Sequence, residues 1–154
     1  MLDLREPDVG DRHRGPPGDR TGARNRQTWM RTMMADDFEQ RCRATIDAYM
    51  AAFNAKDLDA LGRTLTEDVT LVDWDVSASG RDDVLATTSR IVSGAALHIT
   101  VRGLLVAEPN AAADIVIAID GTSDLDVLDL FAFAPDGRIR SIRAFRGPQR
   151  TRPR

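Results

Sequence analysis

LDVLDLFAFAPDGRIRSIRAFR, residues 125–146, predicts two antiparallel strands joined by a tight turn at Asp136-Gly137. Side chains alternate between the two faces of a strand, so every second residue from 125 to 133 lies on one face. The other face of this strand is also mostly apolar, which is typical of a central strand covered on both sides. We therefore expect a sheet built outward from this hairpin.

Asp129 is the one charged residue on the first of these faces, among Leu125, Val127, Phe131 and Phe133. A carboxylate that stays ionised there costs on the order of several kcal/mol, so it must be paired, solvated in a cavity, or protonated. The strand holds no Lys or Arg that could pair with it. Two interpretations stay open: a functional carboxyl, or an Asp satisfied by backbone or water at a bulge.

Outward from the hairpin, the pattern predicts an α+β fold. Apolar residues recur at helical spacing from Phe38 to Phe53, which indicates a helix of roughly 18 residues capped by Asp36 or Asp37. Asp57 is a good N-cap for a second, short helix. The remaining elements are a third helix over 81–92 and strands over 68–74, 96–107, 112–120, 124–134 and 138–146. The order ααβαββββ predicts three helices on one face of a curved antiparallel sheet, a cone with a cavity between the layers.

Composition limits the classes of function. The chain has 154 residues, enough for one domain, and a net charge of -3 with mixed signs, so we expect no nucleic-acid partner for the folded part. The single cysteine, Cys42, cannot form an intramolecular disulfide, and His13 and His98 belong to no cluster with metal-ligand spacing. No apolar run could span a bilayer and no signal peptide is recognisable, so we expect no membrane partner and a cytoplasmic location.

Residues 1–34 are rich in Arg, Asp, Gly and Pro and show almost no apolar periodicity, so we expect a disordered extension. A basic arm, a partner-binding tail, or an extension from a start codon chosen too early are alternatives. The domain is expected over 35–147, and 148–154 is expected to be a disordered tail because Pro148 and the Arg-rich end stop the last strand.

Three segments together resemble a known family. AYMAAFNAKDLDAL (48–61), EDVTLVD (67–73) and LDLFAFAPDGRIRSIRAFRG (128–147) are similar to bacterial ketosteroid isomerases, within the larger nuclear transport factor 2-like, SnoaL-like group. The resemblance covers nearly all of 38–147. Its helix and hairpin motifs are shared across the group, so they imply the cone-shaped, cystatin-like fold more strongly than any one chemistry.

The resemblance also implies three catalytic residues. Tyr49, on the first helix, matches the tyrosine that donates to the oxyanion; Asp73, twenty-four residues later, matches the general base; and Asp129 matches the second oxyanion donor. A protonated Asp beside a Tyr in an apolar oxyanion hole is the known arrangement of this family. From the residues alone, a core tyrosine bonded to a backbone carbonyl and a strand-end Asp in solvent stay open for Tyr49 and Asp73.

The implied reaction moves a proton alpha to a carbonyl through a dienolate, and it needs no cofactor or metal. We expect a small hydrophobic carbonyl substrate, steroid or polyketide-like, and an apolar wall for it. Three residues depart from the family: Trp74 replaces a proline, Thr88 a tyrosine, and Arg146 an apolar pocket residue. The expected substrate-binding residues are Val69, Leu71, Trp74, Phe131, Phe133 and Arg146.

Two other functions fit the same fold. One is a polyketide-cyclase-like enzyme that uses Asp129 or Asp73 for acid-base work. The other is a non-catalytic ligand-binding or dimerising module, since family analogy suggests a homodimer through the open face of the sheet. An epoxide hydrolase is disfavoured. That chemistry resembles an Asp-Arg-Asp arrangement with Arg and Asp two residues apart on one strand, whereas here Arg102 is followed by Gly103 and Leu104. The candidates for the open face are His98, Thr100, Arg102, Arg140 and Ile142.

Overall fold

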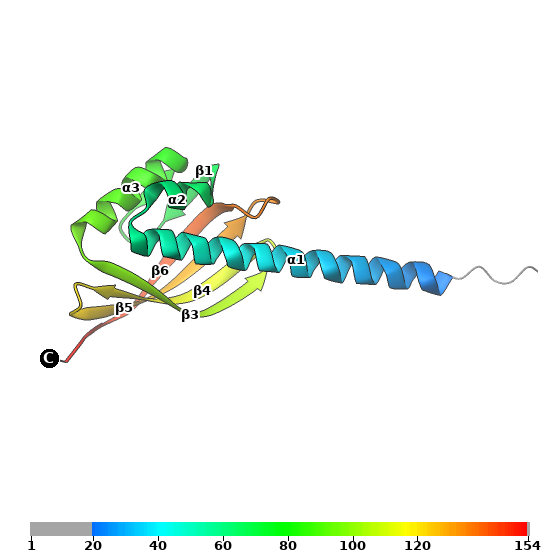
Figure 1. The fold of residues 1–154 in the computed structure, drawn as a ribbon. Coiled ribbons are helices and arrows are strands. Elements are labelled where there is room, and N and C mark those ends of the chain that lie inside the picture. The colour runs from blue at the N-terminus through cyan, green and yellow to red at the C-terminus, as the bar shows by residue number, and fades with distance from the viewer. Residues whose placement is uncertain (1–19, 154) are drawn as a thin grey trace, which may run out of the picture.

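The computed structural model describes residues 20–153, which form three helices and one six-stranded sheet (Figure 1). The helices are α1 (Arg20–Ala55), α2 (Leu58–Arg63) and α3 (Arg81–Gly94). The strands are β1 (Leu65–Val72), β2 (Ser77–Ser79), β3 (Leu97–Ala107), β4 (Asn110–Ile119), β5 (Ser123–Phe133) and β6 (Ile139–Thr151). Their order across the sheet is β2-β1-β6-β5-β4-β3.

The helices lie on one face of the curved sheet, and the buried core fills the space between the two layers (Figure 1). Strands β3 to β6 form the antiparallel meander, while β1 pairs in parallel with β6 and antiparallel with β2. This confirms the predicted α+β fold. Strand β2 is an addition: with three residues, it is too short to leave an alternating pattern in the sequence.

Local chemistry places the ends of several elements. The carboxylate of Asp57 accepts a hydrogen bond from the backbone N of Ala60 at 2.9 Å, which confirms the predicted cap of α2. Asp120 and Gly121 both have positive φ, 51° and 67°, as the tightest turns between antiparallel strands require. Gly137 has φ 84° in the turn between β5 and β6. These turns fix the register in which β4, β5 and β6 pair.

The helix α1 begins at Arg20, well before the predicted cap at Asp36 or Asp37. Residues 20–34 contain no proline and several good helix formers, so the helix continues toward the N-terminus although this part adds nothing to the core. Figure 1 shows it extending away from the sheet. The predicted disordered extension therefore differs from the structure over 20–34, and its first 19 residues lie outside the described part.

Strand β6 runs on to Thr151, so the predicted disordered tail is wrong for residues 148–151. The register between β5 and β6 shifts between Leu125 and Val127 of β5. Such an irregularity lets β6 accommodate Pro148. Beyond it, ion pairs across the sheet hold the strand end.

The outer face of the sheet, on the side away from the helices, carries no covering layer within the described residues. Leu105, Leu128 and Phe145 on this face are 76%, 43% and 44% exposed. The prediction that β5 is covered on both sides is therefore wrong for the single chain. Within residues 20–153, no helix is both long and apolar enough to cross a bilayer.

Candidate functional site

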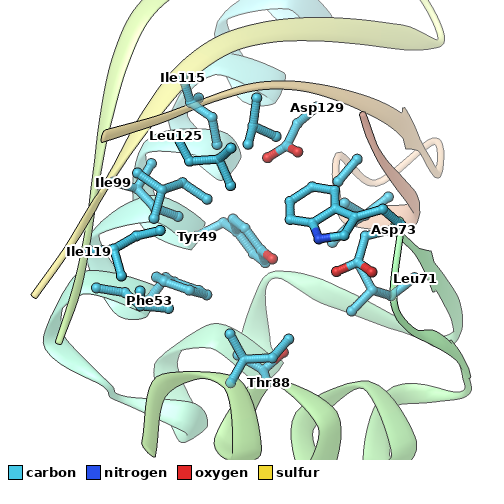
Figure 2. Close-up of a pocket in the computed structure, with 17 residues that line it drawn as sticks. Tyr49, Phe53, Leu71, Asp73, Thr88, Ile99, Ile115, Ile119, Leu125 and Asp129 are labelled. Carbon is cyan, nitrogen blue, oxygen red and sulfur yellow. The ribbon is translucent and has the colours of Figure 1, made fainter. Parts of the chain in front are cut away.

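A cavity of about 180 Å³ lies between the helices and the inner face of the sheet (Figure 2). Its polar groups are the hydroxyls of Tyr49 and Thr88, the carboxyls of Asp73 and Asp129 and the indole N–H of Trp74; aliphatic and aromatic groups make up the rest. The lining residues come from α1, α3, the end of β1 and strands β3 to β6. They are Tyr49, Phe53, Leu71, Asp73, Trp74, Thr88, Ile91, Leu97, Ile99, Ile115, Ile117, Ile119, Leu125, Val127, Asp129, Ile142 and Ala144.

Asp129 projects from β5 into this cavity and is 7% exposed. Within residues 20–153, no group donates a hydrogen bond to its carboxyl. Burial, and after it the negative charge of Asp73, raises the pKa of Asp129 to about 7. A buried carboxyl can be paired, solvated in a cavity, or protonated. The structure favours a carboxyl that faces a cavity and is protonated near neutral pH.

Tyr49 lies on the buried side of α1, with its ring edge-to-face against Phe131 at a centroid distance of 5.9 Å. Figure 2 shows its hydroxyl directed into the same cavity as Asp73 and Asp129. No protein group in the described residues accepts or donates a hydrogen bond at this hydroxyl. Burial, followed by the charge of Asp129, raises the pKa of Tyr49, so the phenol stays protonated and can donate.

Asp73 follows directly after β1, in a tight turn. Its Oδ1 accepts hydrogen bonds from the backbone N of Asp75 and of Val76, both at 2.7 Å, and its own backbone N donates to the carbonyl of Val76 at 3.0 Å. These bonds orient the carboxylate and leave its second oxygen without a protein partner among the described residues. Asp73 is therefore half-buried at the cavity rather than a strand-end residue in solvent.

The predicted substrate wall coincides only in part with the lining of the cavity. Leu71 and Trp74 line the cavity, whereas Val69, Phe131 and Phe133 lie in the core beyond it. Phe133 packs edge-to-face on Phe38 of α1 at 6.5 Å and stacks with Phe131 at 6.4 Å, so these rings fill the closed end of the cone. Arg146 lies outside the cavity and exposed, with its guanidinium carbon 6.0 Å from the centroid of the Trp74 ring.

Most of the actual wall comes from residues that the sequence analysis did not single out. The alternation of Ile115, Ile117 and Ile119 along β4 is the signal that could have found part of it. Ile142, predicted for the open face, is instead buried at 2% exposure and lines the cavity. A register irregularity between β5 and β6 lies between the turn and this residue, which is why simple alternation from the turn misplaced it.

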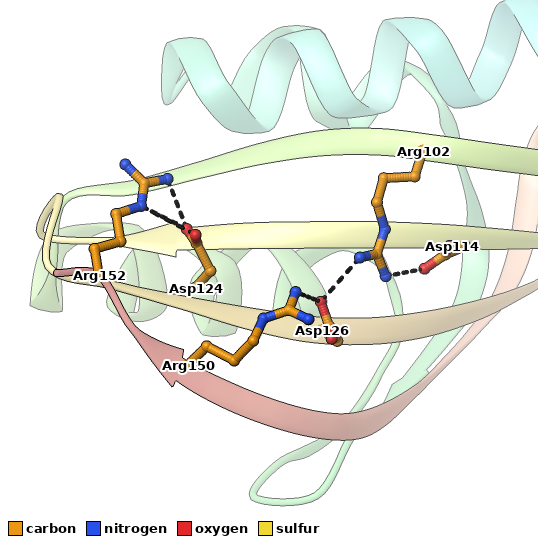
Figure 3. Close-up of polar contacts among 6 residues, drawn as sticks. All are labelled: Arg102, Asp114, Asp124, Asp126, Arg150 and Arg152. Carbon is orange, nitrogen blue, oxygen red and sulfur yellow. Dashed lines mark hydrogen bonds and ion pairs between the residues drawn. The ribbon is translucent and has the colours of Figure 1, made fainter.

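The outer face of the sheet holds a separate group of charges (Figure 3). Arg102 bonds to both Asp114 and Asp126, and Asp126 also accepts from Arg150 at 2.7 Å. Asp124 pairs with Arg152 nearby. An Asp-Arg-Asp grouping therefore exists, but on the side of the sheet opposite the cavity, where it cannot act on a ligand held there.

No three His, Cys, Asp or Glu side chains within residues 20–153 are arranged to hold a metal ion. The polar chemistry of the cavity thus centres on two hydrogen-bond donors, Tyr49 and protonated Asp129, and one oriented carboxylate, Asp73, beside the Thr88 hydroxyl and the Trp74 N–H. This set can stabilise negative charge on an oxygen and accept a proton from a nearby carbon.

A family model described as "SnoaL-like domain" matches residues 46–142. A search of curated proteins found no match. Among solved structures, a proposed ketosteroid isomerase from Kribbella flavida has a TM-score of 0.65 and 20% identity, covering 75% of this chain and 84% of that one. The epoxide hydrolase/cyclase-like enzyme SalBIII of salinomycin pyran-ring formation has a TM-score of 0.66 and 22% identity, covering 74% and 98%. A proposed polyketide cyclase from Sinorhizobium meliloti has a TM-score of 0.62 and 19% identity, covering 66% and 93%.

Proposed function

The chain belongs to the SnoaL-like domain family, and we propose that it is an isomerase that moves a proton alpha to the carbonyl of an apolar ketone. The observation that carries this proposal is the convergence of Tyr49, Asp73 and Asp129 on one mostly apolar cavity. Proteins of similar fold, at 20% and 19% identity, are named as a ketosteroid isomerase and a polyketide cyclase, which supports an enzyme.

In the proposed reaction, Asp73 acts first. Its ionised carboxylate removes a proton from the carbon beside the carbonyl and later returns that proton to another carbon of the resulting dienolate. The two turn amides that hold Oδ1 keep the second oxygen available for this transfer. The base therefore needs no rearrangement of the turn between the two proton transfers.

Tyr49 and protonated Asp129 stabilise the dienolate. Both are buried donors without a protein acceptor in the described residues, so their hydrogen bonds are available to the substrate oxygen as its charge develops. The apolar wall strengthens these bonds by excluding water. Asp129 donates only in its protonated form, which its pKa of about 7 allows at neutral pH and below.

The test is isomerisation of a β,γ-unsaturated ketone by the full-length protein, followed by the absorbance of the conjugated enone. A cyclohexenone and a four-ring ketosteroid would both be offered. Asp73→Asn keeps the oxygen that caps the turn but removes the base, so we expect turnover to fall about 10²–10⁴-fold. Asp75→Asn, a change of an exposed carboxylate two residues away, is the matched control and should retain activity. Equal activity of the two variants would contradict the proposal.

A second candidate is a cyclase that uses Asp129 as an acid on a polyketide-like carbonyl compound. The raised pKa of Asp129 and the similarity to a proposed polyketide cyclase favour it. The two candidates differ at Asp73. An isomerase needs it as base, whereas loss of activity in Asp129→Asn but not in Asp73→Asn would support the cyclase.

We also propose that the chain forms a homodimer through the outer face of its sheet. The exposed side chains of Leu105, Leu128 and Phe145 are apolar and lie on that one face, as self-association surfaces require. If Tyr49, Asp73 and Asp129 catalyse no reaction, the same surface and cavity would suit a ligand-binding or dimerising module. The cytoplasmic location expected from the sequence stays a prediction.

A further inference from the structure

Trp74 lies at the boundary between the cavity and solvent. It follows Asp73 in the turn after β1, lines the cavity, and is 39% exposed. The indole therefore has part of its surface toward the cavity and part toward water. A large side chain in this position limits how far a ligand can extend out of the cavity.

The exposed guanidinium of Arg146 contacts the indole ring of Trp74. Its guanidinium carbon lies 6.0 Å from the centroid of the Trp74 ring, within the range of a cation–π contact. The guanidinium donates to the side-chain oxygen of Gln149 at 3.0 Å, and the Gln149 amide donates to the Ser123 hydroxyl at 3.2 Å. These contacts connect the indole to the paired ends of β5 and β6.

The enclosed space is small. An apolar cavity of about 150 Å³ holds one benzene ring, whereas pockets for larger ligands span roughly 300–1,000 Å³. At about 180 Å³, this cavity has room for one ring, or for two fused rings with slight movement of the wall. A four-ring ligand is larger than this space, and Trp74 is the lining residue with exposed surface at its boundary with solvent.

We propose that Trp74 restricts the site to one- and two-ring ketones and excludes four-ring steroids. This inference rests on the proposed function for the chemistry of the substrate, while the size limit can be measured by binding alone. The lining holds no Lys, Arg or His and is mostly apolar, so the ligand that fits it is mostly apolar and carries no negative charge.

Two matched phenols test the size limit, since a phenol presents an oxygen to Tyr49 and Asp129 as a dienolate would. Tetrahydronaphthol is the fused two-ring part of estradiol, so the pair differs only in the two further rings with their methyl and hydroxyl groups. Binding of each to the full-length protein would be measured by titration calorimetry. We expect the wild-type protein to bind tetrahydronaphthol at least about tenfold more tightly than estradiol, and Trp74→Ala to reverse that order.

Trp74→Phe, which keeps an aromatic ring, should give an intermediate preference and guards against loss of folding in the alanine variant. Tyr49→Phe should weaken binding of tetrahydronaphthol, which shows that the phenol occupies this cavity. Tight estradiol binding by the wild-type protein would overturn the inference, as would an unchanged preference in both Trp74 variants or binding of neither phenol. If the phenols bind as expected but no ketone is isomerised, the proposed function fails and the size limit stands.

Discussion

Asp129 of β5 lies opposite Ala144 of β6 in the register of the sheet, and Ala113 of β4 is its partner on the other side. Neither alanine side chain is long enough to fill the space in front of the carboxyl. Asp129 therefore faces a cavity while it stays almost completely buried. In such a place the protonated form is favoured, which accounts for its raised pKa.

The first prediction concerns the pH dependence of stability. The pKa of Asp129 is about 7 in the folded protein against 3.8 for an ordinary Asp, so between these values the folded state binds more protons than the unfolded state. The free energy of unfolding must then fall as pH rises through this window. Asn at position 129 does not titrate. The free energy of unfolding of Asp129→Asn minus that of the wild type should therefore increase from pH 4 to pH 8, by at most about 4 kcal/mol.

Urea denaturation of both proteins at pH 4, 6 and 8 measures this difference. The other carboxyl groups are common to both proteins, so their titrations cancel in the comparison. A difference that stays constant over this range would show that Asp129 titrates at its ordinary pKa.

The second prediction concerns the pH dependence of the proposed reaction. Because Asp129 must be protonated to donate, kcat/KM should fall as pH rises above about 7. Asn at this position still donates through its amide, so Asp129→Asn should keep part of the activity and lose the alkaline decline. The measurement is kcat/KM from pH 5 to pH 9 for both proteins. The same decline in both would assign it to another group.

The third prediction separates the chemical from the structural role of Tyr49. Its hydroxyl has no protein partner among the described residues, so Tyr49→Phe should leave the free energy of unfolding unchanged or slightly higher. Loss of one oxyanion donor should lower kcat about 10²–10³-fold. Thermal unfolding and steady-state kinetics of the same variant measure both effects. A clear loss of stability would indicate a structural hydrogen bond instead.

Alternation along a strand could place Asp129 on the inner face of the sheet, but it could not say how deep along that face a residue lies. Phe131 and Phe133 share the face of Asp129, yet they pack against Tyr49 and Phe38 at the closed end. Which part of the face stays open depends on where α1 crosses the sheet. That crossing is a tertiary relationship with no signature in either segment alone.

The two ends of the domain could not be predicted for a related reason. Pro148 and the arginines after it indicate a strand end locally, but the backbone of β6 pairs with β5 up to Thr151, and Arg150 and Arg152 meet Asp126 and Asp124 of that strand. These pairs join residues far apart in the sequence, so no local pattern contains them. At the other end, α1 continues on helix propensity although its added turns have no buried face.

The fourth prediction follows for this helical extension. Trp29, Met30, Met33 and Met34 are 63–69% exposed, so the turns before the domain contribute little to its core. A variant that begins at Met34 should therefore keep the melting temperature and the ligand affinity of the full chain. A substantial fall in melting temperature would show that the extension belongs to the folded domain, contrary to a domain boundary near residue 35.

The fifth prediction tests the outer face as a dimer interface. Phe145 and Leu128 face each other across β6 and β5 and are 44% and 43% exposed, so a charge placed between two such surfaces would lose its hydration in the interface. Leu128→Glu should therefore convert a dimer into a monomer, as measured by light scattering after size-exclusion chromatography. Met33→Glu introduces the same charge at an apolar residue of the helical extension that is 69% exposed, so it is the control and should stay dimeric. A monomeric wild-type protein, or a dimer that only Met33→Glu disrupts, would rule out this face.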